Sequence, residues 1–138
     1  MVFQLHPKLA SDCFSVGDFP LCKLLLMNDH NYPWFILVPR RVEVREIYEL
    51  SDLDQAQLWR ESSQLSRSLM QAFKGDKLNI AALGNQVPQL HLHHIVRFQK
   101  DAAWPAPVWG RVASQPYSPA ERAECLDKLK PHLKKNFA

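Results

Sequence analysis

Residues 84–98 carry the strongest pattern in this chain, and they read Gly84-Asn85-Gln86-Val87-Pro88-Gln89-Leu90-His91-Leu92-His93-His94-Ile95-Val96-Arg97-Phe98. Half of the chain's six histidines fall within four of these positions. On a β-strand, successive side chains point to opposite faces. One face would carry a mainly polar row, namely Gln89, His91, His93, Ile95 and Arg97. The other face would be apolar apart from His94. This split predicts a strand that buries one face in a core and presents the other to a ligand.

Three polar groups on one strand face are costly to bury unless they serve a purpose. Neighbours on one face of a strand lie roughly 6–7 Å apart, a spacing that suits groups surrounding one small anionic centre. Gln89, His91 and His93 are therefore the candidate site residues. His94 points the other way and is expected to be a hydrogen-bonded residue beneath a helix. No function is assigned to the three isolated histidines, which are His6, His30 and His132.

The flanking sequence predicts an antiparallel sheet with one long helix. Strands are expected at 12–18, 21–27, 34–38 and 77–83, and the dense turn signal at 28–33 joins the second and third strands in a hairpin. Apolar residues at helical spacing predict a helix over 52–74, with an N-cap at Ser51 and a C-terminal stop at Gly75. Ser118, Pro119 and Glu121 start a short C-terminal helix, after which Lys134 and Lys135 are expected to fray. Residues 1–12 show no clear periodicity, and residues 99–117 predict an ordered but irregular segment.

Length and composition indicate one globular domain that spans residues 1–138. Residues 1–6 lack the basic region and apolar core of a secretory signal, and the longest apolar run, 34–38, is too short to span a bilayer. The three cysteines form no CxxC pair, so reduced thiols and a cytoplasmic location are expected. The net charge of +3 comes from scattered basic residues, which argues against nucleic acid as a partner.

Two kinds of chemistry fit the polar row. A His-x-His pair on a strand can ligate a metal ion, but it needs a third ligand, and no obvious one lies nearby in the sequence. Alternatively, one imidazole can attack phosphorus as a nucleophile while hydrogen-bond donors hold the phosphate oxygens. His93 and the amides of Asn85 and Gln86 are suitable donors. His91, which has a polar neighbour on each side, is favoured as the nucleophile.

The stretch from Gly84 to Arg97 resembles the signature of the histidine-triad (HIT) superfamily, in which three histidines alternate with apolar residues. Gln89, His91 and His93 take the three triad places, so this chain is a Gln-x-His-x-His variant. The hairpin from Leu24 to Pro39 and the Trp104-Pro105 segment are also similar to family features. The resemblance covers about 12–110, which leaves 111–138 as a C-terminal extension.

The resemblance implies an α+β fold with a five-stranded antiparallel sheet, one long helix and a short C-terminal helix, usually in a homodimer. It implies a nucleotide hydrolase or nucleotidyl transferase that acts at the α-phosphate of nucleoside-monophosphate conjugates, similar to the diadenosine polyphosphate hydrolases. His91 would form a covalent nucleotidyl-histidine, His93 and Gln89 would assist it, and Asn28, Asn85 and Gln86 would bind the nucleotide. No cofactor is implied, and assistance by a divalent cation is left open.

Three departures from the family pattern support an alternative function. The loop between Ile80 and the triad is short, which predicts that phosphate contacts there are missing. Gln89 replaces the first histidine, and a carboxamide can position a group but cannot act as a general acid. Gln86 stands where many members carry serine or threonine. A nucleotide-binding module with little or no turnover is therefore the alternative function.

Overall fold

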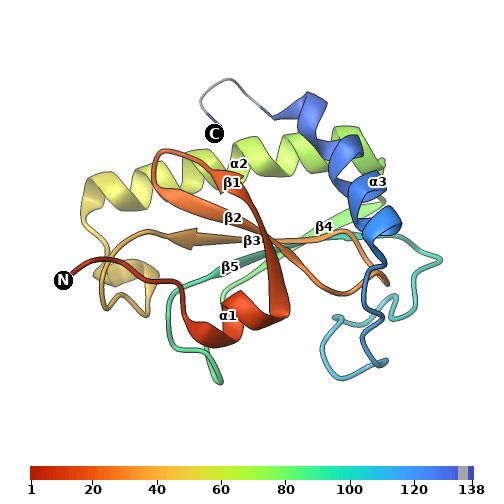
Figure 1. Ribbon diagram of the computed structural model, residues 1–138, viewed down its shortest axis with the longest axis horizontal. Helices are drawn as coiled ribbons and strands as arrows, with labels where there is room; N and C mark the ends of the chain where they lie inside the picture. The colour runs from red at the N-terminus through yellow and green to blue at the C-terminus, as the bar shows by residue number, and fades with distance from the viewer. Residues whose placement is uncertain (134–136) are drawn as a thin grey trace.

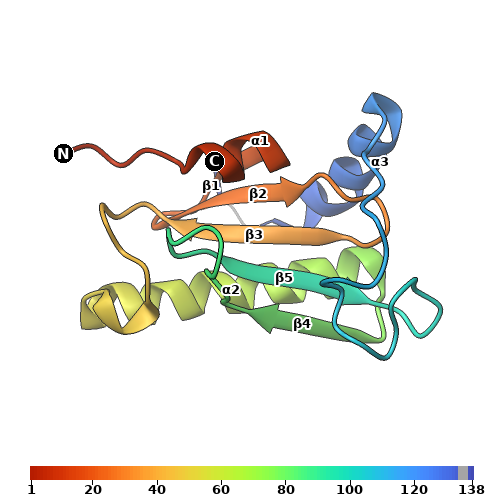
Figure 2. The same ribbon diagram turned by 90° about the horizontal axis from the view of Figure 1, so that it is seen from below.

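The computed structural model describes residues 1–133 and 137–138, and it holds a single five-stranded antiparallel sheet. The strands are β1 (Cys13–Asp18), β2 (Cys22–Met27), β3 (Trp34–Pro39), β4 (Lys77–Ala81) and β5 (Leu92–Arg97). Their spatial order is β1-β2-β3-β5-β4, so the site-bearing β5 lies between β3 and β4 (Figure 2). This architecture confirms the α+β prediction. The expected fraying of Lys134 and Lys135 concerns residues outside the described ranges.

Helices cover both faces of the sheet. Figure 1 shows the long helix α2 (Asp52–Phe73) along one face, with α3 (Pro119–Leu129) beside it and α1 (Pro7–Asp12) on the other side. Short 3-10 turns occupy Ile47–Glu49 and Lys130–His132. Ser51 caps α2 by accepting a hydrogen bond from the Asp54 N–H at 3.1 Å. Helix α1 was not predicted, because its six residues are too few to show an apolar period.

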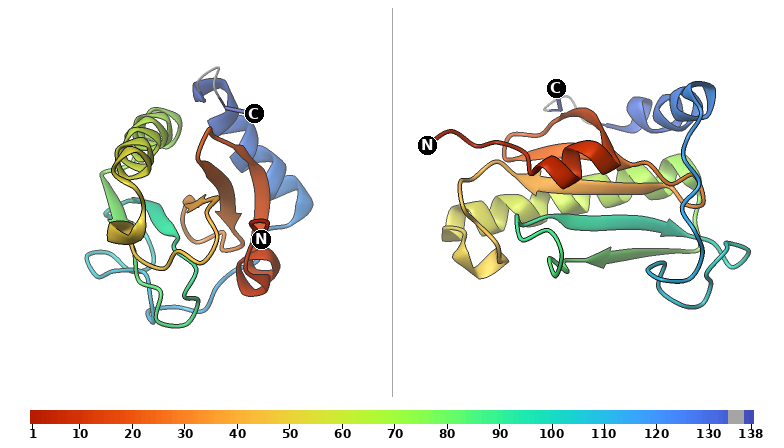
Figure 3. Two further views of the ribbon diagram at one scale, coloured as in Figure 1. Left: turned by 90° about the vertical axis from the view of Figure 1, so that its left-hand side faces the viewer. Right: turned by 60° about the horizontal axis from the view of Figure 1, so that its bottom comes forward.

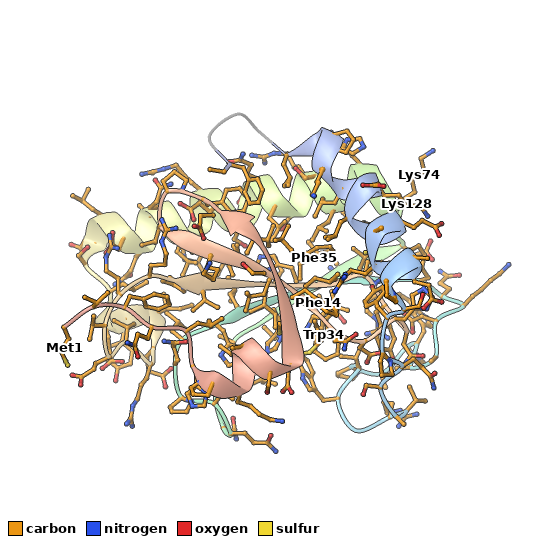
Figure 4. The ribbon with its side chains drawn as sticks, in the orientation of Figure 1. Met1, Phe14, Trp34, Phe35, Lys74 and Lys128 are labelled. Atoms are coloured by element: carbon orange, nitrogen blue, oxygen red, sulfur yellow. The ribbon has the colours of Figure 1, made fainter. Side chains whose placement is uncertain are left out.

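The alternation of side chains divides the core into two clusters. Phe35, Leu92 and Val96 belong to the cluster under α2, together with Leu58, Leu65 and Leu69 of that helix. Trp34, Ile36 and Ile95 belong to the cluster on the opposite face, where Leu9 of α1 joins them. Figure 4 shows Phe35 and Trp34, neighbours in β3, on opposite sides of the sheet. Both strands of the hairpin, β2 and β3, are therefore covered on both faces, as their continuous apolar runs predict.

The end of α2 differs from the sequence prediction. Lys74, not Gly75, adopts the left-handed conformation (φ 55°) that ends the helix. Gly75 serves another purpose, because a Cβ atom there would lie 2.3 Å from Cγ1 of Val96 and 3.2 Å from the carbonyl oxygen of Arg97. The absence of a side chain lets the chain leaving α2 pass close against β5.

A buried carboxylate connects α2 to the sheet. Glu61 is 1% exposed, and it accepts hydrogen bonds at 2.8 Å from the backbone N–H groups of both Leu21 and Cys22. The Gln57 side chain donates a further bond of 2.7 Å to it. These two amides lie where the chain enters β2, so Glu61 satisfies backbone donors that have left water.

Replacing Glu61 with alanine is expected to lower the free energy of unfolding by about 2–5 kcal/mol, because two buried N–H groups lose their acceptor. Chemical denaturation measures the loss. Glu124→Ala is the matched control, since this glutamate of α3 is 74% exposed and its removal should change stability by less than about 0.5 kcal/mol. Equal stability of Glu61→Ala and the wild type would contradict the assigned role.

Candidate active site

The alternation of side chains along β5 places His93 and His94 on opposite faces, as predicted. His93 lies opposite Ile36 of β3 and Ala81 of β4, on the face that α1 covers. His91, just before the strand, has its ring centroid 4.9 Å from that of His93. The two side chains are 7% and 4% exposed, respectively. The pair therefore lies in a largely buried position on the α1 side of the sheet.

A backbone carbonyl orients the His91 ring. Nδ1 of His91 lies 2.7 Å from the carbonyl oxygen of Gln89. Because a carbonyl can only accept, Nδ1 must carry the proton. In the neutral ring, Nε2 then keeps its lone pair, which is the form a nucleophile requires.

An indole sets the opposite tautomer on His93. Nε1 of Trp34 donates to Nδ1 of His93 at 3.0 Å, and an indole nitrogen is a donor only, so the proton of neutral His93 is on Nε2. Burial, followed by the neighbouring His91 and His94, lowers the pKa of His93 to about 3. His93 is therefore a neutral N–H donor at physiological pH.

Two tryptophans enclose His93, and sequence reasoning did not assign either to the site. The ring centroid of Trp109 lies 5.0 Å from that of His93 and 5.6 Å from that of Trp34. Trp109 belongs to the irregular 99–117 segment and is 37% exposed, so it borders the site where solvent begins. In the sequence, Trp104 and Trp109 indicate that this irregular segment packs onto a surface.

His94 is a structural residue, as strand parity predicts. It is 0% exposed beneath α2, where Nε2 lies 2.7 Å from Oγ of Ser62. Its Nδ1 lies 3.1 Å from the Leu92 carbonyl oxygen and must donate to it, so Nε2 accepts from the hydroxyl when the ring is neutral. Burial lowers the pKa of His94 to about 4.

The prediction that Gln89 continues the polar strand face is wrong. Strand β5 begins at Leu92, because β3 pairs only with Leu92–Ile95 and β4 only with His93–Arg97. The preceding segment is held differently, with the Leu90 N–H donating to the Val44 carbonyl at 2.9 Å. The Gln89 carboxamide is hydrogen-bonded to Gln4 and His6 in the N-terminal segment.

Arg97 is buried rather than presented to a ligand. It is 2% exposed and forms a two-pronged ion pair with Asp101, at 2.8 and 3.0 Å, while Oδ1 of Asn79 accepts a third bond at 2.8 Å. Burial opposes ionisation of Asp101, but Arg97 and three backbone N–H groups lower its pKa to about 2. Arg97 therefore anchors the loop after β5.

The predicted nucleotide-binding residues lie in two places. Asn28 lines a cavity of about 410 Å³ together with Trp34, and the other lining residues are Lys8, Ser11, Asp12, Met27, Asp29, Ser114 and Pro116. Its Oδ1 accepts the Tyr117 N–H at 2.8 Å. Asn85 and Gln86 are exposed in the loop before β5, after Gly84 with its φ of +83°. Within the described residues, no hydrogen bond joins either of them to His91, His93 or His94.

Neither a metal cluster nor a membrane-spanning helix is found in the described part of the chain. Within residues 1–133 and 137–138, no group of three or more His, Cys, Asp or Glu side chains is arranged to hold a metal ion. Over the same residues, no helix combines the length and the apolar character needed to cross a membrane.

Comparison with known proteins agrees with this geometry. A family model described as the HIT domain matches residues 8–100. A histidine triad protein from Bradyrhizobium japonicum shares 46% identity and superimposes with a TM-score of 0.95, covering 97% of this chain and 100% of its own. One from Marinobacter aquaeolei shares 55% identity with a TM-score of 0.93, covering 96% and 97% of the two chains. One from Sinorhizobium meliloti shares 40% identity with a TM-score of 0.92, covering 95% and 97%. No curated protein matches the chain.

The lowered pKa values of His93 and His94 predict that stability falls with acidification. Below the ordinary histidine pKa of about 6.5, these two rings become protonated in the unfolded chain but stay neutral in the folded one. The free energy of unfolding therefore drops as pH falls from about 6.5 toward 4. The expected loss between pH 7 and 5 is about 2 kcal/mol for each of the two rings. Denaturant titrations at both pH values measure it. His93→Asn should remove about half of the loss, and an undiminished loss would contradict the assignment.

Proposed function

Because the chain belongs to the HIT domain family, we propose that it is a nucleotide hydrolase or nucleotidyl transferase. It acts at the α-phosphate of nucleoside-monophosphate conjugates such as dinucleoside polyphosphates, with adenosine as the base. The observation that carries this function is the opposite tautomers of two adjacent rings: His91 has Nε2 free to attack, and His93 has Nε2–H to donate.

The first step is attack of His91 on phosphorus. A P–N bond forms between Nε2 of His91 and the α-phosphorus while the P–O bond to the leaving group breaks, and its electron pair departs with that oxygen. The ring becomes positively charged as the bond forms. The Nδ1–H to Gln89 carbonyl bond of 2.7 Å stabilises that charge and prevents the ring from rotating. In the second step, water or an acceptor hydroxyl attacks phosphorus, the P–N bond breaks, and the nucleotide is released.

His93 supplies a hydrogen bond to the phosphate rather than a proton to the leaving group. With a pKa of about 3, the ring is neutral throughout the physiological range, and its Nε2–H can be donated to a phosphoryl oxygen. Trp34 and Trp109 keep water from this donor, which strengthens the bond. The exposed amides of Asn85 and Gln86 are further donors that the loop before β5 can bring to the phosphate.

The cavity beside Asn28 is the proposed nucleoside site. Its volume of about 410 Å³ is within the range of small-molecule sites. Trp34 lines the cavity and also bonds His93, so a nucleoside in it would have its phosphate directed toward the two histidines. Since Oδ1 of Asn28 accepts from Tyr117, the side chain would bind a ribose hydroxyl through its NH₂ group.

A nucleotide-binding module with little turnover is the second candidate. The Gln89 side chain is committed to the N-terminal segment and carries no transferable proton, so the first triad place supplies no acid for the leaving group. This function predicts saturable binding of AMP by calorimetry with no product formed from diadenosine polyphosphates. Release of AMP by the wild-type protein would rule it out.

We also propose that the protein acts in the cytoplasm as a homodimer without a bound cofactor. Strand β4 is an edge of the sheet, and Ile80 on it is 42% exposed, which provides a surface for pairing with a second copy. Sedimentation analysis of the mass in solution tests this association.

The catalytic role of His91 predicts a covalent intermediate. Incubation with diadenosine polyphosphates and rapid acid quench should yield protein whose mass is increased by one adenylyl group, located on His91 by peptide mapping. His91→Ala should lose the adduct and at least about a thousandfold in turnover, because no other group replaces the nucleophile. His132→Gln, on the short turn after α3, is the control and should form the adduct normally. An adduct in His91→Ala would contradict the mechanism.

A further inference from the structure

The carboxamide of Gln89 bridges two parts of the chain that are far apart in sequence. Its Oε1 accepts the backbone N–H of His6 at 2.9 Å, and its Nε2 donates to the backbone carbonyl of Gln4 at 2.9 Å. These groups flank Leu5 and belong to main chain that lies outside any strand. The side chain thus satisfies one donor and one acceptor, as a neighbouring strand would do.

The segment held by Gln89 leads directly into α1. The imidazole of His6 caps that helix by accepting the Lys8 N–H at 3.0 Å. Phe3 and Leu5 are partly buried against the core cluster of the α1 face, and Leu9 is 4% exposed within it. Figure 3 shows the N-terminal segment and α1 lying together across the side of the sheet opposite α2. The Gln89 bonds are the polar anchor of this otherwise apolar contact.

Helix α1 forms one wall of the cavity beside Asn28. Lys8, Ser11 and Asp12 of α1 line the cavity together with Trp34 of β3. The position of α1 therefore sets the width of the cavity. No other described side chain forms a hydrogen bond to the backbone of residues 3–6.

We propose that Gln89 is a positioning residue that clamps residues 4–6 and thereby holds α1 as a wall of the nucleotide site. Its side chain does not touch the reacting atoms, and it acts on binding through α1. The nature of the ligand rests on the proposed function, whereas the clamp itself does not.

Gln89→Met tests the clamp, because methionine has nearly the same shape and neither hydrogen-bonding group. Hydrogen exchange followed by mass spectrometry should show faster exchange of the amides in residues 4–12, by about tenfold, with the amides of α2 unchanged. The affinity for AMP, measured by calorimetry, should fall by about three- to tenfold. Unchanged exchange over residues 4–12 overturns the clamp. Faster exchange with unchanged AMP affinity overturns its role in the site.

A pair of variants at His6 isolates one of the two bonds. His6→Pro removes the N–H that Gln89 accepts, and the φ of −55° at this position suits proline. His6→Ala removes the same imidazole but keeps the N–H, so it is the matched control. The proline variant should exchange faster than the alanine variant over residues 7–12, and adding Gln89→Met to it should have a smaller effect than in the wild type. Full additivity of the two changes contradicts the clamp.

The measurements separate the two proposals. If the wild type neither binds AMP nor releases it from diadenosine polyphosphates, the proposed function fails, and the exchange data alone then decide whether Gln89 clamps the N-terminal segment. If AMP binds normally to the wild type and to every Gln89 and His6 variant, the proposed function stands and the positioning role fails.

Discussion

Hydrogen bonding of the buried imidazoles on β5 and just before it is the constraint on which the site depends. A buried ring must find a partner for its N–H and keeps its charge only at high cost, which is why the pKa values of His93 and His94 lie well below the ordinary value. Each ring has one nitrogen bound by a fixed partner, namely the Gln89 carbonyl, the Trp34 indole or the Leu92 carbonyl. Those partners determine whether the second nitrogen of each ring carries a proton, and this difference underlies the proposed roles of His91 as nucleophile and His93 as donor.

Local patterns in the sequence were sufficient for the features that depend on periodicity. The period of two along 92–97 placed His93 and His94 on opposite faces, and the structure confirms this, with Ser62 of α2 beside His94. The helical period over 52–74 predicted α2 to within one residue of each observed end. The strands predicted at 12–18, 21–27 and 34–38 match the observed ends to within one residue, because turn residues border them. By contrast, β4 ends at Ala81 rather than 83, and β5 begins only at Leu92. Such features can be predicted without a structure because they depend on residues that are close together in the sequence.

The features that were missed depend on contacts between distant segments. The Gln89 side chain is hydrogen-bonded to His6 and Gln4, which lie 83 and 85 positions earlier in the chain. Nothing near Gln89 in the sequence therefore indicates that its side chain leaves the polar row. Likewise, the indole that sets the His93 tautomer comes from β3, 59 positions earlier. Arg97 follows the alternation of side chains along β5, but its guanidinium is bound by Asp101 and Asn79 and does not face a ligand. For His93 and Arg97, parity predicted the face correctly and the partner on that face decided the role, whereas Gln89 precedes β5 and parity does not apply to it.

Gln89 makes two separate sets of contacts, one through its backbone and one through its side chain. Its backbone carbonyl orients His91, and its side chain holds the N-terminal segment. A carbonyl is present whatever the side chain, so a glutamine at the first triad place leaves the tautomer of His91 intact. The side chain is then free to take on a second task, and a carboxamide suits it because it offers both an acceptor and a donor to the main chain of residues 4–6. In the proposed mechanism, Gln89 therefore orients the attacking nitrogen of His91 through its backbone and holds α1 beside the proposed nucleotide site through its side chain.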